Sequence, residues 1–408
     1  MRILLIGAGG VGDAFARIVA RRDFFEACVV ADYDVGRAER TVAELARRHP
    51  GERRFTAARV DASDPAAVTA LARRHRITHI LNAVDPRFVM PVFTGALAAG
   101  ADYLDMAMSL SRPHPQRPHE LVGVKLGDEQ FAVADDWAAA GRLALVGIGV
   151  EPGLSDVFAR YAADHLFSSI DELGVRDGSN LVVDGYDFAP SFSIWTTIEE
   201  CLNPPVIWEA GRGWYTTAPF SEPEVFDFPG GIGPVECVNV EHEEVLLMPR
   251  WLDAKRVTFK YGLGQEFIDV LRTLHKLGLD RTRPVSVKGH QVSPRDVVAA
   301  CLPDPAGLGD RMRGATCAGT YVTGTGTDGG RRAVYLSHVV DNEWSMAEYG
   351  AQCVLWQTAV NPAVALELLA SGQWSGTGVL GPEAFDAMPF LDLLSGDHAS
   401  PWEISERG

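Results

Sequence analysis

The chain has few of the residues from which disulfide frameworks and metal centres are built. Its 408 residues include only six cysteines, and no two of them form a C-x-x-C pair. This pattern predicts reduced thiols and a cytoplasmic location. His75 and His79 have the spacing of metal ligands, but they straddle the expected boundary between a helix and a strand, so we predict no metal. The scattered cysteines are Cys28, Cys201, Cys237, Cys301, Cys317 and Cys353.

Long apolar runs and a basic surplus are also missing. No run of about 18 apolar residues occurs, so we expect no membrane span, and the first apolar run is too short for a signal peptide. Lysine and arginine total 37 against 54 acidic residues, a formal charge of −17. This balance argues against nucleic acid or an anionic membrane as a partner. It is compatible with a cationic substrate, although surface acidity more often serves solubility.

Two enzyme motifs are absent. No tyrosine has a lysine four positions later, so the Tyr-x-x-x-Lys pair of short-chain dehydrogenases is missing. The first glycine-rich turn also lacks the Gly-Lys-Ser/Thr of a P-loop. The sequence therefore favours neither class.

A glycine-rich turn opens the chain. Gly7, Gly9 and Gly12 follow the apolar run Arg2–Ile6 at G-x-G-x-x-G spacing. The first glycine allows a tight turn, the second lets a pyrophosphate approach the backbone, and the third lets the helix pack close to the strand. Apolar residues at helical spacing follow, namely Val11, Ala14, Phe15, Ile18 and Val19. We predict a strand–turn–helix unit that binds a dinucleotide at the N-terminus of the helix.

Asp32 ends the second expected strand, Cys28–Ala31, about 25 residues after Gly7. A carboxylate at this position accepts hydrogen bonds from the adenosine ribose and repels a 2′-phosphate, so we predict NAD rather than NADP. Asp34 is a second candidate, and Arg37 leaves NADP open. The alternative is a purely structural unit with Asp32 as a helix cap. The predicted cofactor-binding residues are Gly7, Gly9, Gly10, Val11, Gly12, Asp32, Asp61, Ala62, Asn82, Ala83 and Val84.

Strands and helices alternate up to Gly149, which predicts a parallel, doubly wound sheet. The further expected strands are Ala57–Val60, Thr78–Ala83, Tyr103–Met106 and Leu143–Ile148. The expected helices include Gly36–His49, one starting at Asp64-Pro65, Phe88–Ala99 and Gly127–Gly141. Residues 1–149 should therefore form a Rossmann domain.

The pattern changes after Gly149. A helix over Gly153–Phe167 precedes strand-like segments that mostly do not alternate with helices, so residues 150–345 should form an α+β domain with a mixed sheet. These segments are Asp171–Arg176, Val235–Val240, Val245–Met248, Val257–Tyr261, Ala315–Thr323 and Ala333–Val339, with helices at Gln265–Leu277 and Pro294–Leu302. We expect residues 187–220 to be irregular.

Residues 346–408 should pack back on the first domain as helices. We predict one helix over Met346–Val360 and a further one opening at Asn361-Pro362, by the rule that a cap residue precedes proline. The fold class is thus α/β, a Rossmann domain joined to a second α+β domain.

Seven stretches carry a family resemblance. They read IGAGGVG, NAVDPRFVMPVFTGALAAGADYLDMA, VGIGVEPGLSD, FPGGIGPVECVNVEHEEV, CLPDPAGLGDRMRG, QTAVNPAVALELLASGQW and GVLGPEAFDAMPFLDLL. Together they resemble the saccharopine dehydrogenase superfamily over nearly the full length. The C-terminal stretches are most similar to the branch of carboxynorspermidine dehydrogenase and its saccharopine dehydrogenase-like neighbours.

The resemblance implies a nicotinamide-dependent oxidoreductase acting at a carbon–nitrogen bond. An amine and a carbonyl compound would form an imine that is reduced to a secondary amine, or the reverse would occur. The alternatives are oxidative deamination of lysine and a non-catalytic dinucleotide-binding sensor or scaffold. The resemblance also implies a homodimer formed through the sheet of the second domain.

Four residues are candidates for acid–base catalysis. Glu151 stands where family members usually carry an aspartate before Pro-Gly, and burial would raise its pKa. His242, in EHEE, matches a family stretch with a histidine on a strand. Tyr103 and Asp105 lie at a strand end that should border the crevice. The structural alternatives are a hinge-fixing cap for Glu151, a solvated strand face for His242, core packing for Tyr103 and loop capping for Asp105.

The predicted substrate contacts follow from position and charge. Asp85 and Pro86, after a strand end, should touch the substrate or the nicotinamide ribose. A substrate carboxylate needs an arginine, and we predict Arg176, although Arg250 and Arg256 are not distinguishable from it. Tryptophans at 195, 208 and 214 would wall an aliphatic chain or simply pack a long loop. The expected partners are a small-molecule amine and a carbonyl compound.

Overall fold

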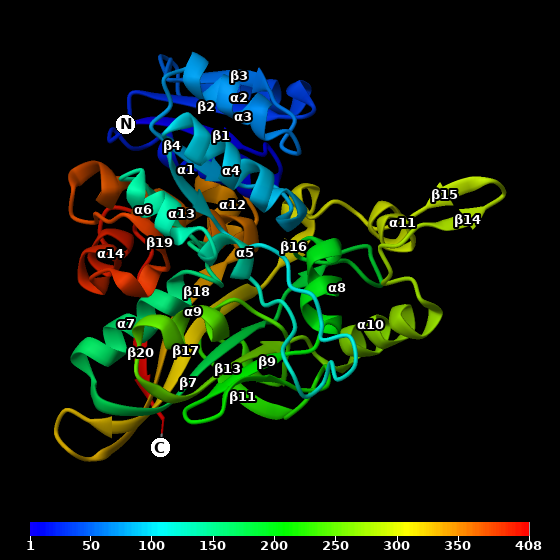
Figure 1. Ribbon diagram of the computed structural model, residues 1–408, viewed down its shortest axis with the longest axis vertical. Helices are drawn as coiled ribbons and strands as arrows, with labels where there is room; N and C mark the ends of the chain where they lie inside the picture. The colour runs from blue at the N-terminus through cyan, green and yellow to red at the C-terminus, as the bar shows by residue number, and fades with distance from the viewer. Residues whose placement is uncertain (408) are drawn as a thin grey trace.

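The computed structural model describes residues 1–407, and its first sheet has seven strands that all pair in parallel (Figure 1). The strand order β19-β6-β5-β4-β1-β2-β3 reverses direction between β1 and β4. In a doubly wound sheet this switch point is where the ligand crevice opens. The strands are β1 (Arg2–Ile6), β2 (Ala27–Asp32), β3 (Phe55–Arg59), β4 (His79–Asn82), β5 (Asp102–Asp105), β6 (Leu143–Leu145) and β19 (Gly378–Leu380). The predicted Rossmann sheet is confirmed.

Aspartate side chains cap two helices of the first sheet, and the helix predicted to start at Asp64-Pro65 begins there. The side chain of Asp34 accepts a hydrogen bond from Gly36 N, and that of Asp64 accepts one from Ala66 N. The predicted helix over Gly127–Gly141 is wrong, because Val133 leaves helical geometry (φ −115°, ψ 23°) and divides it into two short helices. The elements are α1 (Gly10–Val19), α2 (Val35–Arg48), α3 (Pro65–Arg74), η1 (Pro86–Phe88), α4 (Val89–Ala99), α5 (Asp128–Phe131) and α6 (Ala134–Ala139).

The second sheet has nine strands and is mixed, as predicted. Its main path is β10-β9-β13-β7-β17-β18-β20, in which β13 and β7 pair in parallel and the other pairs are antiparallel. The strands are β7 (Phe167–Ser179), β9 (Val206–Glu209), β10 (Gly213–Thr216), β11 (Glu224–Phe228), β12 (Gly233–Asn239), β13 (Ala254–Gly262), β17 (Ala315–Gly326), β18 (Arg331–Asp341) and β20 (Glu403–Glu406). Two small ribbons join β8 (Val182–Val183) to β16 (Met312–Arg313) and β14 (Val285–Val287) to β15 (His290–Val292).

Helices cover this second sheet, and one of them was predicted as a strand. The apolar run Val245–Met248 is fully buried, so it shows no one-sided helical periodicity, yet it forms part of a helix. Residues 187–220 are also more ordered than predicted, because a helix and two strands form there. The helices are α7 (Leu154–His165), α8 (Ile194–Leu202), α9 (Glu244–Trp251), α10 (Gln265–Leu277) and α11 (Pro294–Cys301), with short turns η2 (Pro305–Gly307) and η3 (Gly309–Arg311).

The C-terminal segment returns to the first sheet, as predicted. It contains α12 (Asn342–Tyr349), α13 (Cys353–Ser371), η4 (Pro382–Ala384) and α14 (Ala387–Ser395), and α13 packs along α1. The predicted helix over Met346–Val360 is wrong, because Gly350 adopts a left-handed conformation (φ 66°) and ends α12. The predicted start at Asn361-Pro362 is also wrong. Both residues are buried inside α13, where tertiary packing overrides the local signal of proline.

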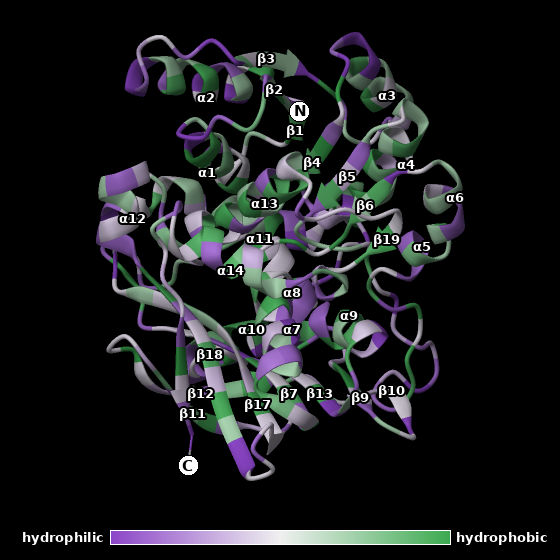
Figure 2. Cartoon of the chain, turned by 90° about the vertical axis from the view of Figure 1, so that its left-hand side faces the viewer, coloured by the Kyte–Doolittle hydropathy of each residue, from purple (hydrophilic) through white to green (hydrophobic). Residues whose placement is uncertain are grey.

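Helix α13 is the hydrophobic centre of the molecule. It has 19 residues and a mean hydropathy of 1.3, enough by length and composition to cross a membrane, but 78% of this stretch is buried inside the protein. Figure 2 shows the contrast between its hydrophobic colour and the mostly hydrophilic α12 on the surface. The burial of α13 is that of a core helix.

A pair of buried carboxyl groups joins the C-terminal segment to α7. Glu383 in η4 and Asp156 in α7 are fully buried neighbours, and no donor group of the described residues bonds to Asp156 Oδ1 or to either oxygen of Glu383. Burial, with the neighbouring carboxylates, raises the pKa of Asp156 well above its usual value and that of Glu383 to about 7. At neutral pH the pair therefore retains a proton.

Candidate active site

A cavity of about 460 Å³ opens between the two sheets at the carboxyl ends of β1, β2 and β4. One end is bordered by the glycine turn and the start of α2. The other end is bordered by residues from the second sheet and from α8. The predicted residues that line it are Gly7, Gly9, Gly10, Val11, Asp32, Asn82, Ala83, Val84, Asp85, Pro86, Glu151 and His242.

The geometry of the glycine turn fits a dinucleotide. A Cβ on Gly7 would lie 2.4 Å from Ala83 O, and one on Gly12 would lie 1.9 Å from Gly7 O, so both positions hold the strand and helix in close contact. A Cβ on Gly9 would meet nothing within 4 Å. Gly9 therefore leaves free space in the cavity beside the N-terminus of α1, where unpaired N–H groups attract a pyrophosphate. Gly12 itself lies behind the turn and does not line the cavity.

Asp32 braces this turn and also borders the cavity. Its carboxylate accepts hydrogen bonds from Ala8 N and Asp34 N, each at 2.9 Å. Arg37, in the first turn of α2, lines the cavity beside it. Asp34 instead caps α2. This end of the cavity thus carries Asp32, an acid suited to a ribose, and Arg37, an arginine suited to a phosphate.

Asp61 and Ala62 were predicted to contact the cofactor, but they lie outside the lining of the cavity. The side chain of Asp61 accepts hydrogen bonds from the backbone N (2.9 Å) and the Oγ (2.6 Å) of Ser63. Its role in the structure is to hold a tight turn after β3.

The end of the cavity formed by the second sheet is strongly acidic. The carboxyl-bearing residues that line it are Glu151 after β6, Asp177 on β7, Glu200 on α8 and Glu243 before α9. His242 and Tyr261 complete this inner end. Asp177, Glu200 and Glu243 were not predicted from the sequence, because they lie on three segments whose convergence no local pattern reveals.

Glu151 and Asp177 form a hydrogen-bonded pair of carboxyl groups. Burial, together with the charges of Asp177 and Glu244, raises the pKa of Glu151 well above its usual value. Burial raises the pKa of Asp177 to about 6, although the hydrogen bond from Glu151 lowers it in part. Glu151 Oε1 is buried without a hydrogen-bond partner. At neutral pH Glu151 therefore holds the proton of the pair and Asp177 carries the charge.

His242 is buried in an ion pair. Its Nδ1 lies 2.5 Å from Glu244 Oε2, and its ring stacks on Phe259 at 3.9 Å. Burial lowers its pKa, but the carboxylates of Glu244, Glu243 and Glu200 outweigh burial and raise the pKa to about 10. The alternative of a solvated histidine on a strand face is wrong. The imidazolium stabilises the charged forms of Asp177 and Glu200, whose pKa values it lowers.

His242, Glu243 and Glu244 also form the one metal-ligand cluster found among residues 1–407. A protonated imidazole has no lone pair for a metal ion, and Glu244 already neutralises it. The cluster therefore fits an ion pair better than a metal centre.

Two of the catalytic candidates, Tyr103 and Asp105, lie outside the lining of the cavity. Tyr103 is fully buried beside Phe93 and Trp137, and its hydroxyl accepts a hydrogen bond from Asn82 Nδ2 at 3.0 Å. Asp105 is buried and accepts hydrogen bonds from Gln130 Nε2 (2.8 Å) and Gly147 N (2.7 Å), with burial raising its pKa to about 7. Neither lines the cavity, because both side chains turn into the core under the strand ends.

The predicted carboxylate-binding arginine also lies outside the lining of the cavity. Arg176 is buried, pairs with Glu224, and donates to Val175 O at 2.8 Å. Arg256 pairs with Glu209 of β9 and with Glu222, and Arg250 lies over the Phe131 ring at 3.8 Å. None of the three lines the cavity.

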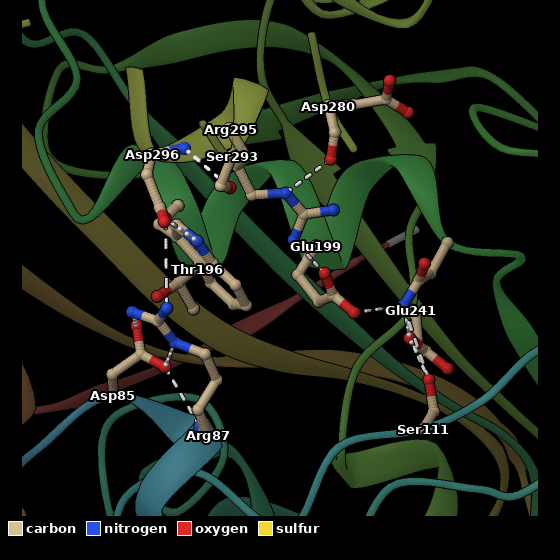
Figure 3. A network of polar contacts seen from close by, with 12 residues as sticks. Asp85, Arg87, Ser111, Thr196, Glu199, Glu241, Asp280, Ser293, Arg295 and Asp296 are labelled. Carbon is tan, nitrogen blue, oxygen red and sulfur yellow. Dashed lines mark hydrogen bonds and ion pairs between the residues drawn. The ribbon is translucent and has the colours of Figure 1, made fainter. Parts of the chain in front are cut away.

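Trp195 joins a polar network that fixes α8 and α11 beside the cavity, and Figure 3 shows the members Arg87, Arg295 and Asp296. Its ring lies between the guanidinium groups of Arg87, at 4.4 Å, and Arg295, at 4.6 Å. Its Nε1 donates to Asp296 Oδ1 at 3.1 Å, and Arg87 pairs with Asp85 at 2.8 Å. Trp195 does not line the cavity, and neither do the stacked Trp208 and Trp214. All three pack the protein.

Comparison with known proteins identifies the family. Residues 3–145 match the family described as Saccharopine dehydrogenase NADP binding domain, and residues 149–398 match Saccharopine dehydrogenase C-terminal domain. Carboxynorspermidine synthase of Vibrio alginolyticus is 30% identical over 413 aligned positions, covering 100% of this chain and 97% of the relative. Carboxyaminopropylagmatine dehydrogenase of Synechocystis is 28% identical over 98% of this chain and 96% of its own length.

A solved structure agrees on the fold. Saccharopine dehydrogenase (L-Glu forming) from Saccharomyces cerevisiae aligns over 100% of both chains with a TM-score of 0.69 at 15% identity. With the glycine turn, the acidic cavity and these matches together, the chain belongs to the saccharopine dehydrogenase family and is an NAD(P)-dependent oxidoreductase.

Proposed function

We propose that this oxidoreductase joins a diamine or longer polyamine to a carbonyl compound and reduces the imine to a secondary amine. The observation that carries the proposal is the inner end of the cavity, where four carboxyl groups converge. Buried carboxylates need cationic partners, and a substrate with two ammonium groups supplies them. The names of the two relatives, a carboxynorspermidine synthase and a carboxyaminopropylagmatine dehydrogenase, support an amine of this kind.

The charge of the cavity disfavours an amino acid as the amine. Among residues 1–407, the one arginine that lines the cavity is Arg37, at the end bordered by the glycine turn. The inner end offers no guanidinium to an α-carboxylate, and the ionised Asp177 would repel one. A saccharopine-type or lysine-deaminating activity is therefore the weaker reading.

The Glu151–Asp177 pair fits the proton transfers that imine formation needs. Ionised Asp177 accepts a proton from the attacking ammonium, which frees the nitrogen lone pair to add to the carbonyl carbon. Glu151 donates its proton to the hydroxyl group of the carbinolamine, which leaves as water and gives the protonated imine. The proton on Asp177 then returns to Glu151 through their hydrogen bond, so the pair ends as it began.

The remaining residues bind and orient. Glu200 binds the second ammonium group, whose charge favours the ionised form of this buried carboxyl group. Gly7, Gly9, Asp32 and the N-terminus of α1 would hold the dinucleotide, which when bound supplies the hydride that reduces the imine. The two sheets enclose the reaction between them and exclude water.

The test is an NAD(P)H-oxidation screen. Diamines, monoamines of the same length and lysine are each combined with aspartate semialdehyde and with 2-oxoglutarate. We expect turnover with diamines, little with monoamines, and a raised KM for the diamine in Glu200→Gln with an unchanged NAD(P)H Kd. Turnover with lysine but not with diamines would contradict the proposal, as would a Glu200→Gln enzyme with an unchanged KM.

A further inference from the structure

A second cavity of about 460 Å³ lies on the first sheet, and no described residue lines both it and the candidate active site. Arg2 and Ala27, which line it, are the first residues of β1 and β2, whereas the glycine turn follows the other end of β1. Its volume is within the range of small-molecule sites in proteins. The other lining residues are Glu26, Val29, Arg53, Arg54, Thr56, Ala57, Ala58, Arg59, Leu71, Arg74 and His75.

The floor of this cavity is largely apolar. Ala27 and Val29 lie on the same face of β2, and Thr56 of β3 pairs with Val29. Leu71 of α3 borders the floor, and Val29 and Leu71 are only 1% and 9% exposed. Because the strand residues have short side chains, they leave space above the sheet in which an organic group can pack.

Arginine side chains surround the floor. Five arginines line the cavity, against the single acid Glu26, in a chain whose net charge is −17. The positive charge of this site is therefore opposite in sign to that of the chain as a whole. We call it the basic cavity.

Most of this positive charge has no counter-ion. Arg54 pairs with Glu52 at 2.6 Å, and Arg2 lies 3.6 Å from Glu26. Guanidinium groups that converge without counter-ions repel one another, so they attract an anion. Among residues 1–407, the lining arginines without a carboxylate partner are Arg53, Arg59 and Arg74.

His75 senses the positive field of the basic cavity. Burial, together with the charges of Arg74 and Arg2, lowers the pKa of His75 below its usual value. Its carbonyl oxygen accepts a hydrogen bond from Arg2 Nε at 2.9 Å, which holds Arg2 in the wall. An anion bound beside these groups would favour the imidazolium and raise the pKa of His75.

The charge and the floor together select the ligand. Guanidinium groups bind phosphate through paired N–H donors. A phosphate group carries a charge of about −1.5 to −2 at neutral pH, so two linked phosphate groups balance the three arginines that lack a carboxylate partner. An organic group attached to the phosphates would cover the apolar floor.

We propose that the basic cavity binds an organic diphosphate, with its phosphate groups on Arg53, Arg59 and Arg74 and its organic group on the floor formed by Val29 and Leu71. The proposal is independent of the substrate and of the reaction, because this cavity is separate from the candidate active site.

A titration followed at His75 tests the proposal on the full chain. The histidines are labelled with ¹³C at Cε1, the variant His75→Gln assigns the signal, and ADP is added at a fixed pH near the pKa of His75. We expect a saturable shift toward the imidazolium. Pyrophosphate and adenosine should each bind more weakly than ADP, because each makes only part of the contacts. Sodium chloride at equal ionic strength controls for screening.

Two double variants separate this site from general surface charge. R53Q/R59Q should raise the Kd for ADP at least about tenfold, because it removes two of the three phosphate-binding arginines and leaves those beside His75 in place. The matched control R73Q/R76Q removes the same charge from residues that do not line the cavity, and it should keep the wild-type Kd. Circular dichroism verifies that each variant is folded.

A His75 signal that ADP leaves unchanged would overturn the proposal. So would a wild-type Kd in R53Q/R59Q, or an equal loss of affinity in R73Q/R76Q. Adenosine that binds as tightly as ADP would contradict the role of the arginines. Pyrophosphate that binds as tightly as ADP would contradict the role of the apolar floor.

Discussion

The buried pair of Glu383 and Asp156 makes the stability of the fold depend on pH in a direction that can be worked out. Burial raises the pKa of Glu383 from 4.5 to about 7. The folded state therefore binds the proton more tightly than the unfolded chain does. This contribution to stability is fully present below about pH 4.5 and is lost as pH rises through about 7. The difference of two to three pKa units corresponds to about 3 kcal/mol of unfolding free energy.

The perturbation is Glu383→Gln, which cannot ionise and still offers an N–H donor to Asp156. Urea unfolding at pH 5, 6, 7 and 8 measures the unfolding free energy at each pH. The wild type should lose about 3 kcal/mol more than the variant between pH 5 and pH 8. Other buried acids contribute equally to both proteins, so the difference isolates this pair.

Glu403→Gln, at an exposed position of β20, is the matched control and should follow the wild type. Equal pH slopes in the wild type and Glu383→Gln would refute the assignment of the shared proton. A wild type that gains stability relative to the variant between pH 5 and pH 8 would show that the sign of the shift is wrong.

Three further predictions concern the cavity and its support. Gly9→Ala should fold normally but raise the Kd for NAD(P)H at least about tenfold by filling the pyrophosphate space, as isothermal calorimetry would measure. Gly12→Ala should instead lower the unfolding free energy by about 1–3 kcal/mol, because its Cβ meets backbone; equal behaviour of the two variants would contradict the assignment. Tyr103→Phe should cost about 1 kcal/mol of stability through the lost hydrogen bond from Asn82 and leave kcat unchanged, whereas a large drop in kcat would restore Tyr103 as a catalytic residue. Glu151→Gln should lower kcat on the order of 10²-fold in the NAD(P)H assay with cofactor Kd unchanged, and full activity would eliminate it as the acid.

The first sheet was predictable from the sequence because its signals are local. Gly7, Gly9 and Gly12 define the turn by their spacing, and the Asp64-Pro65 step marks the start of a helix. Each of these signals depends only on residues that are close together in the sequence. The alternation of strands and helices then predicts that the strands pair in parallel.

The acidic cluster was only partly predictable. Glu151 and His242 stood out because the family resemblance singled out their positions. Asp177, Glu200 and Glu243 come from a strand, a helix and a loop that are distant in sequence and meet only in the folded protein. Nothing in their immediate sequence separates them from the many surface acids of this chain.

Several expectations differ from the structure for one physical reason, which is burial on all sides. Tyr103 and Asp105 stand at a strand end, where exposure to the crevice was the natural expectation, but neighbouring segments cover them. The run Val245–Met248 and the Asn361-Pro362 step are likewise enclosed. A helix that is buried on all sides has no polar face, so its sequence lacks the alternation of apolar and polar residues by which a helix is recognised.

The path of the last sixty residues has a consequence for how the protein comes apart. β19 is the outermost strand of the parallel sheet, and β20, which follows it in the chain, is the outermost strand of the mixed one. The C-terminal segment therefore supplies an edge strand to each of the two sheets. Removing the residues from Gly378 onward would therefore take an edge strand from both sheets at once. Because one segment belongs to both sheets, we expect the two sheets to unfold in a single cooperative transition rather than one after the other.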